Sequence, residues 1–130
     1  MNLLVVDDNS DYLFLLDLAL SLGGYTVFTA EDGLEGIEVL ETKDIDLIIS
    51  DIRMPHLDGI KLHSYVRNTD KYCQTKFIFV TGFKDVYANV VVLDPALDFF
   101  LEKTTSTEDL LKLVNRLLKE DFAGKTLKAL

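Results

Sequence analysis

The sequence predicts an α/β fold in which a parallel sheet is covered by helices on both faces. Short apolar runs alternate with helical segments five times along the chain. The central run, Leu47 to Ile49, is apolar at every position, as in a strand that is buried on both faces. Parallel strands need right-handed crossover connections, and these place helices on either side. We therefore expect a three-layer, doubly wound, five-stranded parallel sheet.

The bulk composition limits the class of protein. At 130 residues with 48% apolar side chains, the chain fits one domain with one core. Its net charge of −9 repels phosphate backbones and anionic lipid, so we expect no direct nucleic-acid binding. A single cysteine excludes an internal disulfide, and His56 and His63 lack the neighbouring ligands of a zinc site. With no candidate membrane span and no basic leader, we expect a cytoplasmic protein.

The first strand is expected at 2–6, and it stops at Asp7 and Asp8. A helix to about residue 22 follows, with Asn9 among its capping candidates and Gly23-Gly24 closing it. This helix carries leucines on two sides, so it packs on more than one surface. It is either deeply buried in this domain or docks a partner on one side, and we expect deep burial.

The later elements continue the alternation, with strands at 25–29, 45–50, 76–80 and 98–101 and helices at about 33–41, 59–67 and 84–93. A last helix starts at Ser106, which forms a capping box with Asp109. The β-branched run 90–92 and Pro95 predict that the helix at 84–93 is short, displaced or mobile. The tail 121–130 extends the last helix, frays or begins a linker, and these alternatives stay open.

Polar groups follow four of the five strands, at the edge where open α/β sheets place their chemistry. They are three acids, a hydroxyl and an amine: Asp7, Asp8, Asp51, Thr81 and Lys103. Carboxylates gathered there repel one another unless a cation intervenes, and oxygen ligands suit Mg²⁺, with Mn²⁺ as a substitute. A metal, a carboxylate, a lysine and a hydroxyl favour phosphoryl transfer onto aspartate. The alternative is five unrelated strand-end residues, with Asp51 serving a turn.

The chain resembles the receiver domains of two-component response regulators over about residues 2–119. The resemblance is carried by Val5-Val6-Asp7-Asp8, by Asp51-Ile52-Arg53-Met54-Pro55 with Asp58-Gly59, by Val80-Thr81-Gly82 and by Lys103. It implies a flavodoxin-like fold with strand order 2-1-3-4-5. It also implies a receiver domain at 1–120, followed by a tail or linker at 121–130.

By resemblance, Asp51 is the phosphoacceptor, served by a sensor histidine kinase or a histidine phosphotransfer protein in a phosphorelay. Asp7, Asp8 and Asp51 would hold Mg²⁺ together with the backbone carbonyl of Arg53. The side chains of Thr81 and Lys103 would bind the phosphoryl oxygens.

Thr81 and Phe100 would be the switch residues, and they would reshape the surface of the fourth helix, fifth strand and fifth helix. Such a protein turns over no separate metabolite, and it is not an enzyme beyond its own phosphorylation and dephosphorylation. A homodimer through the first helix or residues 90–93 is a further partner that we consider.

Three departures from the family pattern bear on this interpretation. Thr104 replaces the usual proline after Lys103, so we predict a trans peptide bond there and a shifted loop. The β-branched run in the fourth helix is the second, and Arg53 and Phe83 flanking the pocket are the third. The first two departures keep open a pseudo-receiver that binds partners without phosphorylation, and the third would alter the access of water and so the lifetime of an acyl phosphate.

Two other classes are alternatives, a flavin or nucleotide carrier and a metal-dependent phosphohydrolase. The carrier is disfavoured because acids replace a phosphate cradle after the first strand, and the hydrolase because Arg53 stands where a second acid is expected.

Overall fold

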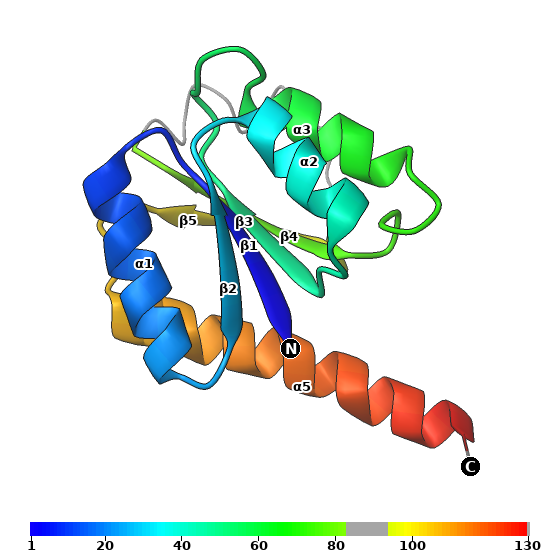
Figure 1. Ribbon diagram of the computed structural model, residues 1–130. Helices are drawn as coiled ribbons and strands as arrows, with labels where there is room; N and C mark the ends of the chain where they lie inside the picture. Colours follow the sequence, from blue (N-terminus) through cyan, green and yellow to red (C-terminus); the bar gives the residue numbers. More distant parts are fainter. Residues whose placement is uncertain (83–93, 130) are drawn as a thin grey trace.

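Figure 1 shows a central sheet between two layers of helices. The computed structural model describes residues 1–82 and 94–129, and for 120–129 it describes the backbone alone. The elements are β1 (Asn2–Val6), α1 (Ser10–Leu22), β2 (Thr26–Ala30), α2 (Gly33–Thr42), β3 (Leu47–Ser50), α3 (Gly59–Arg67), β4 (Lys76–Thr81), β5 (Asp98–Glu102) and α5 (Thr107–Ala129). The five strands are all parallel and run in the order β2-β1-β3-β4-β5. The predicted fold class and strand order are confirmed.

The strands hold the layers together because both of their faces are apolar. Along β1, Leu3 and Val5 belong to the core beneath α1 and α5, whereas Leu4 and Val6 belong to the core beneath α2 and α3. All residues of β3 and β4 are buried, as expected for central strands with helices on either side. In Figure 1, α2 and α3 cover one face of the sheet and α1 and α5 cover the other.

Most predicted boundaries differ from the observed ones by one or two residues. Strand β2 begins one residue later than expected, because the Tyr25 N–H donates to the carbonyl of Leu20 and closes the turn after α1. The predicted Ser106 cap is present, with its hydroxyl accepting from the Asp109 N–H at 3.1 Å. Helix α5 continues to Ala129, so the tail extends the helix. The predicted helix at 84–93 lies outside the described residues.

Helix α1 is not deeply buried, which corrects our expectation from its composition. Its inner leucines are less than 9% exposed, but four outer side chains are exposed: Phe14 (71%), Leu15 (47%), Leu18 (48%) and Leu22 (80%). The physical reason is that the sheet and α5 cover only the inner side of α1. Within 1–82 and 94–129, no helix has the length and hydropathy needed to cross a bilayer.

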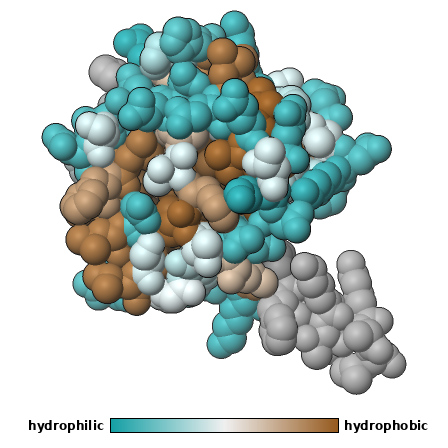
Figure 2. All heavy atoms as spheres, in the orientation of Figure 1, coloured by the Kyte–Doolittle hydropathy of each residue, from teal (hydrophilic) through white to brown (hydrophobic). Residues whose placement is uncertain are grey.

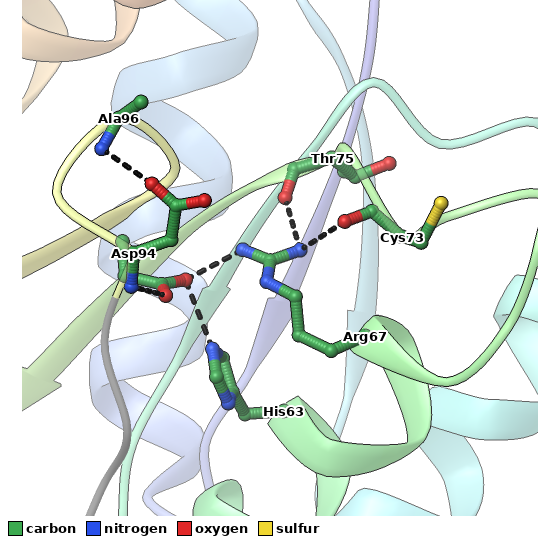
Figure 3. A network of polar contacts seen from close by, with 7 residues as sticks. His63, Arg67, Cys73, Thr75, Asp94 and Ala96 are labelled. Atoms are coloured by element: carbon green, nitrogen blue, oxygen red, sulfur yellow. Dashed lines mark hydrogen bonds and ion pairs between the residues drawn. The ribbon is translucent and has the colours of Figure 1, made fainter.

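A buried ionic network ties α3 to the start of β5. The carboxylate of Asp98 accepts from His63 Nε2 at 2.9 Å and from the Arg67 guanidinium at 2.5 Å, and its second oxygen accepts from the Asp94 N–H at 2.8 Å. Arg67 also donates to the carbonyl of Thr75 at 2.7 Å. Figure 3 shows His63 and Arg67 reaching from the same helix toward this point. The network shows that His63 has a structural partner on β5, which the sequence did not indicate.

Candidate functional site

The carboxyl ends of the central strands bring two of the predicted acids side by side. Val6 and Ser50 are register partners in β1 and β3, so the residues that follow them, Asp7 and Asp51, leave the sheet together. The backbone ladder continues one step further, since the Asp51 N–H donates to the carbonyl of Val6 at 2.9 Å. Both carboxylates are therefore held by strand geometry. Their side chains are 2% and 9% exposed.

Lys103, which directly follows the edge strand β5, completes this group. Its ammonium lies 2.9 Å from Asp7 Oδ2 and 3.0 Å from Asp51 Oδ2. The Lys103 N–H donates to the carbonyl of Thr81 at 3.2 Å, so β4 and β5 present these residues together. The structure thus brings Asp7, Asp51, Thr81 and Lys103 to one edge of the sheet, as the strand-end pattern predicted.

The acids of the site fit a divalent cation. Oxygens of Asp7, Asp8 and Asp51 all lie within 4.8 Å of one another, and Asp8 is exposed at the mouth. Asp7 Oδ2 is buried but accepts no well-directed hydrogen bond from the described residues, despite the nearby ammonium. Three clustered carboxylate oxygens, one of them incompletely bonded, are a donor set suited to a hard cation such as Mg²⁺.

The loop after β3 holds Asp51 in place. Asp51 Oδ1 accepts from the Ile52 N–H at 2.7 Å, and the Gly59 N–H donates to the carbonyl of Ile52 at 2.8 Å. A Cβ at Gly59 would collide with the Asp51 carbonyl oxygen, so only glycine allows α3 to begin this close to the acid. The side chain of Arg53 is exposed on this loop. The role expected for its carbonyl oxygen stays a prediction.

The electrostatics of the pocket follow from burial and from the close charges. Burial raises the pKa of Asp7, because the hydrogen bond from the Asn9 N–H and the nearby Lys103 ammonium do not offset the desolvation of its charge. Burial alone would lower the pKa of Lys103, but the ion pairs with Asp7 and Asp51 outweigh this effect and raise the pKa. The lysine is therefore charged and bridges two carboxylates.

Two aromatic residues adjoin these groups. The ring of Phe100, the expected switch residue, is half-buried and stacks on Phe79 with centroids 4.9 Å apart. The ring of Tyr12, which the sequence did not single out, lies with its centroid 5.0 Å from Lys103 Nζ. Its only sequence signal is its position four residues after Asp8, in the first turn of α1. The Lys103–Thr104 bond is trans, since the described residues contain no cis peptide, and this agrees with the prediction.

Comparison with known proteins identifies relatives over nearly the whole chain. A family model described as the response regulator receiver domain matches residues 3–115. The transcriptional regulatory protein GlrR of Escherichia coli (strain K12) is 33% identical over 119 residues, which cover 92% of this chain and 26% of GlrR. The response regulator MprA of Mycobacterium ulcerans is also 33% identical over 119 residues, covering 92% of this chain and 50% of MprA. The chain thus spans half or less of these curated relatives.

Solved structures show the same fold. A CheY-like receiver domain from Methanospirillum hungatei has a TM-score of 0.81 at 25% identity, with 95% of this chain and 97% of that chain covered. The chemotaxis protein CheY4 of Vibrio cholerae has a TM-score of 0.78 at 29% identity, with 89% and 97% covered. The receiver domain of the hybrid histidine kinase CckA has a TM-score of 0.76 at 27% identity, with 91% and 99% covered.

Proposed function

Because this chain belongs to the family of response regulator receiver domains, we propose that Asp51 accepts a phosphoryl group from a phosphohistidine. The donor is a sensor histidine kinase or a histidine phosphotransfer protein, the partners with which receiver domains interact. The single observation that carries the proposal is the bridge from Lys103 to Asp7 and Asp51, which holds a nucleophile and a cation in one pocket.

The reaction is a transfer between two side chains. An oxygen of Asp51 attacks the phosphorus of the phosphohistidine, a P–O bond forms, and the P–N bond breaks with its electrons returning to the imidazole, which takes up a proton. Asp51 is prepared for attack because the Ile52 N–H holds Oδ1 and leaves Oδ2 facing Lys103. The chain then catalyses only its own phosphorylation and dephosphorylation, and we propose that it turns over no separate metabolite.

The surrounding residues stabilise the charge that develops during transfer. The Lys103 ammonium, 3.0 Å from the acceptor, would bind a phosphoryl oxygen, and the hydroxyl of Thr81, the last residue of β4, would donate to another. Asp7, Asp8 and Asp51, with the carbonyl of Arg53, would hold Mg²⁺, which neutralises negative charge when bound. Phosphorylation adds charge and acceptors at Asp51, so Thr81 and Lys103 move toward it.

That movement reaches the outer surface through β4 and β5. Thr81 ends β4 and is the register partner of Glu102, directly before Lys103, and Phe100 lies two residues earlier on β5. A shift of Thr81 therefore changes the space available to the Phe100 ring. We propose that this biases the surface formed by β5 and α5 between two states.

The acceptor is tested by mass spectrometry after incubation with Mg²⁺ and acetyl phosphate. The wild-type chain should gain one phosphoryl group, and Asp51→Asn should gain none. Asp58→Asn is a matched control, because Asp58 caps α3 through its Oδ1 and asparagine caps helices equally well. An unmodified wild-type chain whose partner binding is unchanged in Asp51→Ala would instead favour the phosphorylation-independent pseudo-receiver.

We propose that the donor docks on the exposed side of α1. Figure 2 shows apolar residues gathered on the side of the molecule that Figure 1 assigns to α1, where Phe14, Leu15, Leu18 and Leu22 are exposed. The helix starts at Ser10, immediately after the acids of the pocket. A protein bound along this face therefore lies beside Asp51, where its phosphohistidine must arrive.

Leu18→Asp should slow phosphorylation by a histidine phosphotransfer protein and leave phosphorylation by acetyl phosphate unchanged. Leu34→Asp is the matched control, because Leu34 is similarly exposed (52% against 48% for Leu18) but lies on α2. Equal rates for both variants would contradict docking on α1. If Leu18→Asp instead converts a concentration-dependent dimer to a monomer in sedimentation, the face is an interface between two copies of the chain.

A further inference from the structure

The ring of Tyr12, in the first turn of α1, lies against the Lys103 ammonium that bridges the acids of the site. The Asn9 carboxamide accepts the N–H groups of Asp11 and Tyr12, so the first turn of the helix is fixed close to Asp7 and Asp8. The tyrosine is half-buried and packs against the core beneath α1 and α5. Its ring centroid lies 5.0 Å from the Lys103 ammonium, which is within the range of a cation–π contact.

We propose that Tyr12 is a positioning residue for phosphoryl transfer, which holds the Lys103 ammonium at the mouth of the pocket. This inference rests on the proposed function and extends it to a residue outside the strand ends. In the structure, Lys103 has two carboxylate partners, Asp7 and Asp51, and both are also candidate metal ligands. A divalent cation bound to those carboxylates weakens their attraction for the ammonium. The cation–π attraction between Lys103 and the Tyr12 ring remains when the cation is bound, because the ring is not a metal ligand.

The chemistry of the ring suits this role. Burial is the main cause that raises the pKa of Tyr12 to about 12, and the negative charge of Asp7 is the second. The ring is therefore a neutral phenol at physiological pH. A neutral ring attracts an ammonium through its face without forming an ion pair that would hold the lysine away from the phosphoryl group. The Lys103 ammonium is already 3.0 Å from Asp51 Oδ2, and because its side chain is 28% exposed it retains room to adjust to a phosphoryl group formed there.

The contact with Lys103 is made by the face of the Tyr12 ring and not by its hydroxyl, so variants that remove one or the other should behave differently. Tyr12→Phe keeps the ring and should behave like wild type. Tyr12→Leu removes the ring face and should lower the affinity for beryllofluoride in Mg²⁺, measured by calorimetry, by about three- to tenfold. The rate of phosphorylation by acetyl phosphate should fall by a similar factor. Tyr65→Leu is the matched control, because Tyr65 is a half-buried tyrosine on α3, packed against the opposite core.

A nuclear magnetic resonance measurement tests the contact without any phosphorylation. Protons on the carbon next to the Lys103 ammonium should be shifted upfield by the Tyr12 ring, and Mg²⁺ should not remove this shift. The shift should persist in Tyr12→Phe and disappear in Tyr12→Leu. Urea unfolding of each variant shows whether its fold is as stable as that of the Tyr65→Leu control.

Three results would overturn the role of Tyr12, and a fourth would refute the proposed function. A Tyr12→Leu chain that is folded and binds beryllofluoride like wild type overturns the proposal, and so does a Tyr12→Phe chain as impaired as Tyr12→Leu. Loss of the upfield shift when Mg²⁺ is added also overturns it. A wild-type chain that shows the Mg²⁺-resistant shift but takes no phosphoryl group retains the contact and refutes the proposed function instead.

Discussion

The buried carboxylate of Asp98 is expected to be a major source of stability, and Asp98→Asn tests this. Asp98 receives hydrogen bonds from His63, Arg67 and the Asp94 N–H, and its side chain is 1% exposed. The substitution keeps the size of the side chain but removes its charge. Arg67 is then left as a partly buried cation that has lost its carboxylate partner.

The size of the effect follows from this burial. Removing one partner of a buried ion pair costs about 3–5 kcal/mol, because the other charge is left uncompensated. The side chain of Arg67 is 18% exposed and still donates to the carbonyl of Thr75, so some of its hydration and bonding survive. We therefore expect a loss of about 3 kcal/mol, which lowers the urea midpoint by about 1–3 M.

Urea unfolding followed by circular dichroism at neutral pH measures this loss. Asp44→Asn is the control, because Asp44 forms an ion pair of 2.7 Å with Lys71 that is solvent-exposed. That exposed pair should contribute no resolvable stability. Equal midpoint shifts in the two variants would refute the reasoning, because they would show that burial does not decide the strength of these pairs. Arg67→Met combined with Asp98→Asn should recover part of the loss.

The same network makes a pH prediction. Burial alone would raise the pKa of Asp98, but hydrogen bonds from His63, the Asp94 N–H and Arg67 outweigh it and lower the pKa. A carboxyl group with a lowered folded pKa stabilises the fold above its unfolded pKa, near 3.8, and this stabilisation is lost as the pH falls through the folded pKa. The wild-type chain should therefore lose more stability on acidification below about pH 4 than Asp98→Asn does. Parallel acid curves would contradict this assignment.

Two further predictions concern the pocket. Gly59→Ala should destabilise the fold by about 2 kcal/mol or more in urea unfolding, because the added Cβ would collide with the backbone of Asp51. Gly82→Ala is the control, because a Cβ there meets no described atom within 4 Å, and it should change the urea midpoint little. Lys103→Met should bind Mg²⁺ about tenfold more tightly in calorimetry, because the competing ammonium between Asp7 and Asp51 is gone. The same variant should lose phosphorylation. Weaker Mg²⁺ binding would show that the lysine does not oppose the metal.

The sequence alone was sufficient for the fold class and for the group of polar residues at one edge of the sheet. Both depend on local rules: an apolar run such as Leu47–Ile49 with helices around it predicts a buried parallel strand, and consecutive parallel strands end at the same edge. Asp7, Asp51 and Lys103 could therefore be grouped before any contact was known. The boundaries erred by one or two residues where turns compete with strands, as at Tyr25.

Only the tertiary structure decided which side chains meet across the chain. The contact of Tyr12 with Lys103 and that of His63 with Asp98 join residues far apart in the chain, and a local pattern indicates at most which helix face is buried, not the residue that it meets. The exposed side of α1 is a similar case. Leucines occur on both sides of this helix, so its sequence does not distinguish the buried side from the exposed one. Only the positions of the sheet and α5 determine that Leu16 is buried while Leu18 is exposed.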